Sequence, residues 1–212
     1  DFRPDYVVDY AGQGMVAQSW DQPQQWFKTN VLSKVVLHEE LRQLTCLKKY
    51  VRFSTPEVYG NTEGDVPETA PLNPSTPYAV SHAAIDMSLL AYHRQYGFPV
   101  ALTRATNVFG PHQQLYRIIP RSIIYAKTGR KLGLDGGGHS IRNFVFIEDV
   151  CEAVWAVMRD APAGAVYHIA SDEWLSIREL VKRICILTGV EFDDFVEVTT
   201  DRPGKDKAYY LQ

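Results

Sequence analysis

Short buried strands alternate with helical segments along almost the whole chain, and this alternation limits the possible folds most strongly. Short apolar runs bounded by turn residues predict strands at 6–10, 50–54, 100–106, 142–147 and 165–170. Longer amphipathic patterns predict helices at 23–44, 78–96, 118–128, 148–159 and 176–187. Strands separated by helices favour a parallel sheet with helices on both faces. The predicted class is therefore α/β, and such sheets bind ligands beyond the carboxyl ends of their strands.

Composition excludes several classes of partner. The chain has 212 residues, enough to bury a sizeable core, and its net charge of −3 offers no basic surface for nucleic acid. No apolar run approaches the roughly 20 residues of a membrane span. Cys46, Cys151 and Cys185 lie far apart and lack the spacing of metal ligands, which suits a reducing compartment. We therefore expect a cytoplasmic globular protein without a membrane, nucleic-acid or metal partner.

A glycine-rich segment follows the first predicted strand. Residues 12–17 (Gly-Gln-Gly-Met-Val-Ala) match the pattern G-x-G-x-x-A, in which the backbone holds a pyrophosphate at a helix N-terminus. The match is weak because the helix that should follow is interrupted at 21–23 by Asp-Gln-Pro. The downstream acids, Glu39 and Glu40, lie in an amphipathic helix rather than at the end of a second strand. The alternative is a small-residue turn that approaches a cofactor closely through its backbone.

Four side chains suggest proton-transfer chemistry on a small polar substrate. Thr55 and Glu57 follow the predicted strand 50–54, and Tyr78 and His82 share one helix face at positions i and i+4. A tyrosine has a pKa near 10, which a cation within roughly 4–6 Å lowers by about 1–3 units. Histidine is mostly neutral at pH 7, but it still hydrogen-bonds a hydroxyl. The alternative is that Tyr78 is an ordinary helix-start aromatic and His82 a solvated side chain.

Blocks of sequence in a fixed order carry a family resemblance. They include Ser-Thr-Pro-Glu-Val-Tyr-Gly at 54–60, Pro-Ser-Thr-Pro-Tyr-Ala-Val-Ser at 74–81 and Asn-Val-Phe-Gly-Pro at 107–111. The other blocks are 7–17, 29–30, 117–120, 140–150 and 201–206. Together they resemble the extended short-chain dehydrogenase/reductase family, in its NAD-dependent nucleotide-sugar epimerase/dehydratase branch, of the dTDP-glucose 4,6-dehydratase type.

The resemblance implies a Rossmann-like parallel sheet with helices on both faces, plus a smaller partial C-terminal substrate-binding region. Residues 1–112 would form the C-terminal portion of the NAD-binding Rossmann domain. Residues 113–212 would form the substrate-binding region, with 141–170 returning strands and a helix to the Rossmann sheet. Family members carry a glycine-rich unit before the position of Asp1 and extend beyond Gln212. We therefore expect a fragment that lacks the pyrophosphate cradle.

The resemblance also implies roles for individual residues. Tyr78 would remove the proton of the sugar 4-hydroxyl while NAD takes the hydride, and His82 occupies the position of a lysine that holds the nicotinamide ribose. Glu57 would abstract the C5 proton, and Thr55 would hydrogen-bond the 4-oxygen. Further cofactor contacts would come from Ala11, Gly12, Asn30 and Ser54. Substrate contacts would come from Gln13, Asn107, Arg117, Arg142 and Arg202, where arginine suits a diphosphate because its planar fork binds two oxygens.

Pro56 departs from the family pattern. The dehydratases of this branch normally place aspartate there, as the acid that expels the C6 hydroxyl, and proline cannot donate a proton. The predicted function is an NAD-dependent dehydratase or epimerase that oxidises C4 of a nucleotide diphosphate hexose transiently. The resemblance also implies a homodimer formed through the helices at 23–44 and 78–96. The alternatives are a catalytically impaired relative that binds a sugar nucleotide, and a reductase of another small carbonyl compound.

Overall fold

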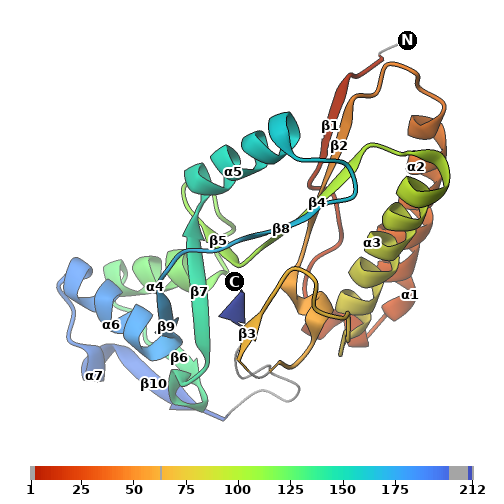
Figure 1. Ribbon diagram of the computed structural model, residues 1–212. Coiled ribbons are helices and arrows are strands. Elements are labelled where there is room, and N and C mark those ends of the chain that lie inside the picture. The colour runs from red at the N-terminus through yellow and green to blue at the C-terminus, as the bar shows by residue number, and fades with distance from the viewer. Residues whose placement is uncertain (1–2, 63, 201–209, 212) are drawn as a thin grey trace.

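The computed structural model describes residues 3–62, 64–200 and 210–211, and its centre is a parallel four-stranded sheet. The strands are β1 (Tyr6–Asp9), β2 (Lys49–Ser54), β4 (Val100–Ala105) and β8 (Val166–Ile169), in the order β1-β2-β4-β8 (Figure 1). Their register places Val8 opposite Val51 and Val51 opposite Ala101. Every pairing in this sheet is parallel, so the predicted α/β class is confirmed.

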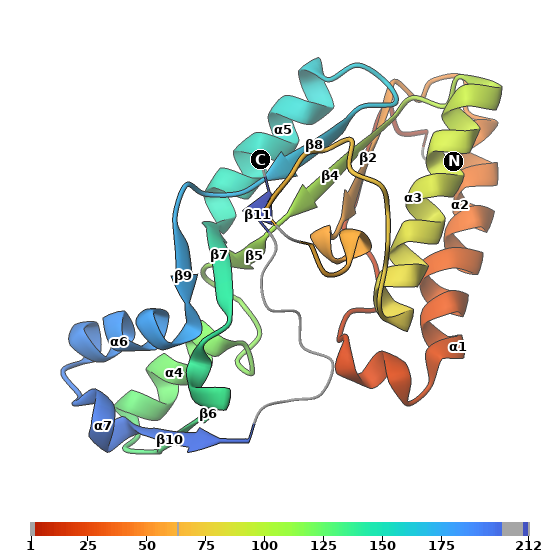
Figure 2. The same ribbon diagram turned by 60° about the horizontal axis from the view of Figure 1, so that its bottom comes forward.

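Helices cover both faces of the sheet. The helix α5 (Ile147–Asp160) lies on one face, and α2 (Ser33–Arg42) and α3 (Pro77–Tyr96) lie side by side on the other (Figures 1 and 2). The helix predicted at 23–44 is interrupted. It consists of α1 (Pro23–Trp26), a π-helical turn (Phe27–Leu32) and α2. The π turn carries Asn30, which is fully buried, and such turns often occur at functional sites.

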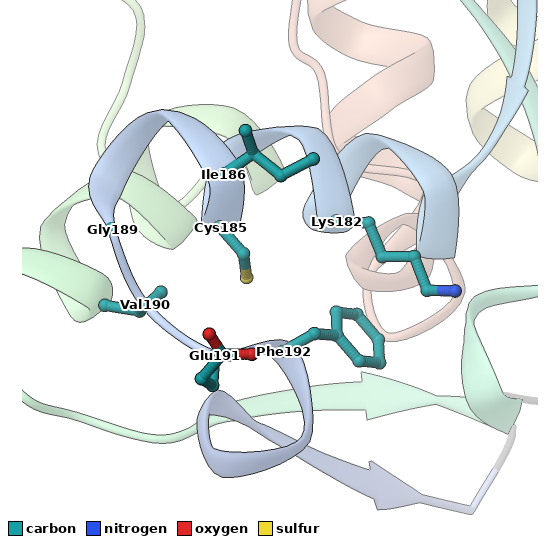
Figure 3. Close-up of a pocket in the computed structure, with 7 residues that line it drawn as sticks. All are labelled: Lys182, Cys185, Ile186, Gly189, Val190, Glu191 and Phe192. Carbon is teal, nitrogen blue, oxygen red and sulfur yellow. The ribbon is translucent and has the colours of Figure 1, made fainter.

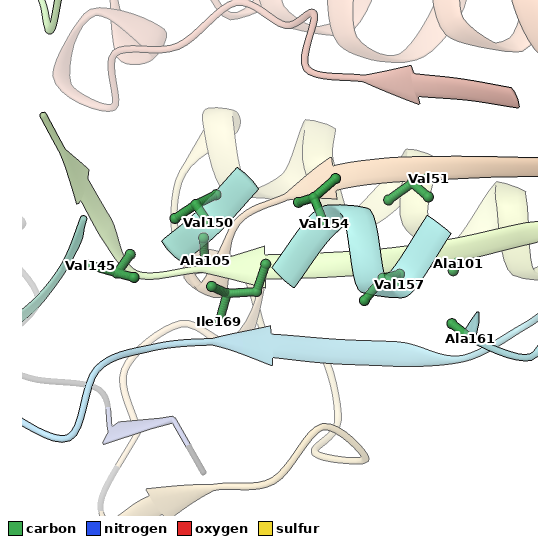
Figure 4. Close-up of a cluster of buried hydrophobic side chains, with 9 residues drawn as sticks. All are labelled: Val51, Ala101, Ala105, Val145, Val150, Val154, Val157, Ala161 and Ile169. Carbon is green, nitrogen blue, oxygen red and sulfur yellow. The ribbon is translucent and has the colours of Figure 1, made fainter. Parts of the chain in front are cut away.

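The strands divide their side chains between two cores, because successive residues of a strand point to opposite faces. Val51 and Ala101 pack with Val154 of α5 in an entirely apolar cluster (Figure 4). Tyr50 and Leu102 pack on the other face, in a cluster that α2, α3 and the following turn complete with Leu41, Leu89 and Phe98. Both faces are thus closed to water.

A second lobe lies at the carboxyl ends of the central strands (Figure 2). It contains the sheet β5 (Asn107–Phe109), β7 (Ile141–Phe146) and β9 (Trp174–Ser176), and the pair β6 (Leu132–Asp135) and β10 (Val196–Thr199). Its helices are α4 (Ile118–Lys127), α6 (Ile177–Thr188) and α7 (Phe192–Phe195), packed around Leu132, Val181 and Phe195. The short strand β3 (Asp65–Val66) pairs with β11 (Tyr210–Leu211). The domain division at 112/113 stays a prediction.

The structure contains short strands that the sequence patterns did not predict. Strands β5, β6, β9 and β10 were not predicted, because three or four residues are too few to show an alternating pattern. The glycine run 136–138 forms a 3₁₀ turn between β6 and β7. None of the helices in the described part of the chain is long and apolar enough to cross a membrane.

Candidate active site

The start of α3 fixes the position of Tyr78. Thr76 caps the helix, because its Oγ1 accepts a hydrogen bond from the Ala79 amide at 3.1 Å, and Pro77 occupies the first helical position. The amide of Tyr78 donates to the Oγ of buried Ser19 at 3.2 Å. Tyr78 therefore stands in the first turn of a long helix with its backbone held from both sides.

The end of β2 brings Thr55 and Glu57 to the same phenol. Thr55 caps the short 3₁₀ turn Pro56–Tyr59, accepting a hydrogen bond from the Glu57 amide at 3.3 Å. The turn ends at Gly60 with φ +67°, where an added Cβ would lie 2.1 Å from the carbonyl oxygen of Asn73. Only glycine fits this approach of the two backbones.

The environment of Tyr78 shifts its pKa in both directions. Burial raises the pKa of Tyr78 to about 12, and the charge of Glu57 acts in the same direction. A side-chain hydrogen bond with Thr55 and the positive charges of Arg52 and Arg117 lower it. The three predicted groups Thr55, Glu57 and Tyr78 therefore share one site, as a proton-transfer mechanism requires.

His82 completes the predicted group of four. Its ring contacts that of Tyr78, with centroids 4.6 Å apart, and only 6% of the residue is exposed. The alternative of a solvated histidine is therefore wrong. Burial first, and then the charges of Arg52 and Lys34, lower the pKa of His82 to about 3, so the ring is neutral at physiological pH. No permanent charge stands at the position where the family resemblance expects lysine.

Behind His82 lies a cluster of buried charged and polar groups that the sequence analysis missed. Nη2 of Arg52 is 3.1 Å from Nδ1 of His82, and Nη1 of Arg52 is 3.3 Å from Asp9. Lys34 contacts the same carboxylate at 2.5 Å and Tyr50 donates to it at 2.6 Å. Burial opposes ionisation of Asp9, but these partners hold its pKa below the ordinary value. Arg52, a charged residue inside the apolar run 50–54, was the sequence feature that could have revealed this cluster.

The loop after β1 adjoins His82. Ala11 and Gly12 are exposed, and a Cβ built on Gly12 would lie 3.9 Å from Nε2 of His82 and 3.5 Å from Oδ1 of Asn30. The Asn30 amide is 0% exposed and is used by the protein: it accepts from the Gln13 amide at 2.7 Å and donates to the Gln13 carbonyl and to Ser81. Asn30 thus holds the loop against α3.

The conformation of this loop determines which end of a cofactor it fits. A short 3₁₀ turn (Ala17–Trp20), not a long helix, follows the G-x-G-x-x-A match, so the segment has no helix N-terminus to hold a pyrophosphate. Its open backbone at Ala11 and Gly12 instead stands beside the Tyr78–His82 pair. The residues present fit the nicotinamide end of NAD, whose reactive ring must lie next to the group that exchanges the proton.

The remaining predicted contacts are more dispersed. Ser54 donates to Asp86 at 2.8 Å within the buried face, and the Asn107 amide donates to the Asn143 carbonyl at 3.0 Å. Arg117 is exposed at the start of α4 and acts electrostatically on Tyr78. The other substrate residues lie at the loop or in the second lobe: Gln13 near Gln25 and Arg142 on β7, while Arg202 falls outside the described residues.

A surface hollow lies elsewhere. It is formed by α6, α7 and the turn between them, and its lining includes Lys182, Cys185 and Phe192 (Figure 3). Figure 1 places α6 and α7 in the second lobe, away from α3 and the Tyr78 site. In the part of the chain that the structure describes, no group of histidine, cysteine or acidic residues is placed to hold a metal ion. All three cysteines are free.

Comparison with known proteins establishes the family. A family model described as the NAD dependent epimerase/dehydratase family matches residues 1–170. The chain belongs to this family. It is 36% identical over 209 residues to a dTDP-glucose 4,6-dehydratase of Streptomyces antibioticus, a match that covers 98% of this chain and 62% of that protein. It is 33% identical to a human dTDP-D-glucose 4,6-dehydratase, covering 98% and 61%.

Solved structures of the family share the fold. A dTDP-glucose 4,6-dehydratase of Streptomyces venezuelae, solved with NAD and TYD bound, superposes with a TM-score of 0.92 at 33% identity. The match covers 98% of this chain and 64% of that structure. A UDP-glucose 4-epimerase of Thermotoga maritima, solved with UDP-glucose, also gives 0.92, at 28% identity, covering 99% and 69%. The chain thus spans about two thirds of these structures, and its family depends on NAD.

Proposed function

We propose that the full-length protein oxidises C4 of a nucleotide diphosphate hexose transiently, with NAD, as a dehydratase or epimerase. The observation that carries the proposal is the convergence of Thr55, Glu57, Tyr78 and His82 at the carboxyl ends of the central strands, beside the open Ala11–Gly12 backbone. The relatives named above act on dTDP- and UDP-sugars, which supports a nucleotide diphosphate substrate.

We assign the two proton transfers of this reaction to different side chains. Tyr78 takes the proton of the 4-hydroxyl, and Thr55, already hydrogen-bonded to the phenol, hydrogen-bonds the 4-oxygen. Bound NAD supplies the hydride acceptor. His82, Ala11 and Gly12 hold its nicotinamide end, while Asn30 and Ser54 support the site from within the protein. Glu57 removes the C5 proton, which a ketone at C4 makes acidic.

The product depends on the turn that carries Glu57. Pro56, buried at the first position of this turn, offers no proton for a C6 leaving group. Glu57 therefore returns the proton that it takes from C5, or the reaction ends in epimerisation or decarboxylation instead. Substrate phosphates bind Arg117 and Arg142, with Gln13, Asn107 and Arg202 as further contacts.

We place the enzyme in the cytoplasm as a homodimer. Large apolar side chains are exposed on the α2/α3 side of the sheet: Leu32 on the π-helical turn, Val36 on α2, and Met87 and Tyr96 on α3. Exposed apolar groups gathered on adjacent helices favour association with a second copy. The split into a Rossmann part, 1–112, and a substrate-binding part, 113–212, belongs to the same proposal.

Solvent-exchange at C5 tests the function. The full-length protein with NAD and a nucleotide diphosphate hexose in D₂O is expected to incorporate deuterium at C5, because Glu57 exchanges its proton with solvent. Glu57→Gln abolishes this incorporation while NADH absorbance still forms. Glu197→Gln, at an exposed carboxylate on β10, serves as the matched control and leaves exchange unchanged.

Other results select the alternatives. Calorimetric binding of a sugar nucleotide without NADH formation identifies a catalytically impaired binding protein. Turnover of a different carbonyl compound, with no binding of any sugar diphosphate, identifies a reductase. Absence of C5 exchange with every competent substrate rules out the role of Glu57.

A further inference from the structure

The cation behind His82 has no assigned role in the chemistry described so far. Arg52 is 0% exposed in the middle of β2, and its Nη2 lies 3.1 Å from Nδ1 of His82. A guanidinium only donates hydrogen bonds, so Nδ1 must be the acceptor. The ring hydrogen of neutral His82 is then on Nε2. This is the nitrogen beside Gly12, where a built Cβ would lie 3.9 Å away.

The buried charges on this face do not cancel. Lys34 pairs with Asp9 at 2.5 Å, and Arg104 pairs with Asp86 at 3.1 Å. Arg52 is the third cation, 3.3 Å from a carboxylate oxygen of Asp9 that also accepts from Tyr50. Two carboxylates against three cations leave one positive charge in excess within this cluster. Lys34 and Arg52 share the carboxylate of Asp9, and of these two cations Arg52 is the one that contacts His82.

We propose that Arg52 is a positioning residue that replaces, one layer deeper, the lysine expected at position 82. Its guanidinium fixes His82 as the Nε2–H tautomer and places a permanent positive charge behind the Tyr78–His82 pair. A single lysine would combine a donor and a charge in one side chain. Here His82 is the donor toward the Ala11–Gly12 edge, and Arg52 carries the charge. The inference rests on the proposed function for its catalytic half and on geometry alone for the tautomer.

The charge acts on a phenol that other groups also face. Arg52 from β2 and Arg117 from the start of α4 favour the phenolate, whereas Glu57 from the 3₁₀ turn opposes it. On its own helix Tyr78 faces neutral His82. Behind His82 stand Lys34 from α2 and Asp9 from β1, which compensate each other at 2.5 Å. Removal of Arg52 therefore removes one of the two positive charges that favour the phenolate.

Nitrogen NMR of the full-length protein without substrate tests the tautomer. With ¹⁵N-labelled histidine, His82 is expected to show a protonated Nε2 and an unprotonated Nδ1 from about pH 5 to pH 8. The signal is assigned by its loss in His82→Gln. A hydrogen on Nδ1, or an imidazolium ring at neutral pH, overturns the proposal. This measurement uses the unaltered chain and needs no turnover.

The pH profile of NADH formation tests the charge. Arg52→Met is expected to move the rise of kcat/KM to higher pH by roughly one to three units, because the phenol loses a nearby cation. Arg52→Lys retains a charge and restores most of the profile. The double variant Arg52→Met/His82→Lys, with the cation back at position 82, also restores it. A merely structural role for Arg52 would lower the amount of folded enzyme and leave the profile where it was.

The proposed function and the role of Arg52 are contradicted by different results. If the unaltered protein forms no NADH with any nucleotide diphosphate hexose, the proposed function fails, and the NMR result still decides the tautomer. If NADH forms and both Arg52→Met and Arg52→Lys keep the original pH profile, the function stands and the positioning role of Arg52 is wrong. If Arg52→Met does not fold, the histidine spectrum of the unaltered chain decides the question.

Discussion

The two faces of the central sheet are built from the same strands but differ in chemistry. On the α5 face, Val51, Ala101 and Val154 belong to a cluster of apolar side chains (Figure 4). On the α2/α3 face, Arg52 is buried one position after Val51, and Arg104 is buried three positions after Ala101. Period-two alternation alone separates Val51 from Arg52. Apolar burial stabilises the first face, whereas the second contains charges that are costly to bury unless they are paired.

The α2/α3 face changes from apolar to polar along the direction of its strands. Near the amino ends of the strands this face is closed by Leu89, Phe98 and Val100. Toward the carboxyl ends it becomes polar, where Ser54 and Arg104 meet Asp86. The ligand site of a parallel sheet lies at these carboxyl ends. We therefore propose that the polar half supports the chemistry, whereas the apolar face stabilises the fold.

The largest expected effect is on the site that the polar face supports. Tyr78→Phe removes the phenolic oxygen and should lower the rate of C4 oxidation by about 10²–10⁴-fold, the usual contribution of a positioned acid–base group. Stopped-flow NADH absorbance measures it. Tyr96→Phe, an exposed tyrosine at the end of the same helix, is the matched control and should keep the rate. Equal rates for both variants would assign the proton transfer to another residue.

The second prediction compares stability on the two faces. Asp9→Asn leaves Lys34 and Arg52 buried without the carboxylate they share, so the free energy of unfolding should fall by about 3–5 kcal/mol. Denaturant unfolding followed by circular dichroism measures the loss. Asp21→Asn changes an exposed carboxyl and should have little effect. A small loss for Asp9→Asn would mean that the cation pair finds other partners or water.

Sequence reasoning reached the site but not the charges beneath it. Thr55 and Glu57 were predicted as site residues because β2 ends there and parallel strands present their carboxyl ends to ligands. Arg52 was missed because a charged residue within a strand ordinarily faces water. Its burial depends on α2 and α3 packing over it and on Asp9, 43 positions away in the sequence.

Other parts of the fold could not be predicted from the sequence for different reasons. The π turn that carries Asn30 has no distinct sequence pattern, because the apolar positions continue through it. The strands of the second lobe are three to six residues long and pair with partners far along the chain, as β5 does with β7. Local pattern therefore predicted the central sheet, β7 and the helices α4 and α6 well, and it missed the short strands β5, β6, β9 and β10.

The third prediction concerns pH, to which the two faces should respond differently. Burial, together with the charges of Arg52 and Lys34, lowers the pKa of His38 to about 4, although Asp9 acts in the opposite direction. The unfolded chain therefore binds a proton before the folded one does. The stabilisation is complete above the unfolded pKa of about 6.5 and is lost as pH falls toward 4, by about 2–3 kcal/mol.

His82, with a pKa of about 3, adds to this loss in the same direction. Asp9, with its lowered pKa, adds a further loss only when the pH falls below the ordinary carboxyl range. Unfolding free energies measured from pH 7 to pH 4.5 should therefore decline, and His38→Gln should flatten the decline. His112→Gln, at an exposed imidazole, is the control and should leave the slope unchanged. An identical slope in His38→Gln would place the proton uptake elsewhere.

The smallest expected effect is on the apolar face. Ile169, 6% exposed at the end of β8, packs in the α5 cluster, and Ile169→Val removes one methylene group. The free energy of unfolding should fall by about 0.5–1.5 kcal/mol. Because this cluster contains only apolar side chains, the loss should be the same at pH 7 and at pH 5. A loss that grows as the pH falls would show that protonation on the charged face reaches through the sheet, and the two faces would then have to be treated as one coupled unit.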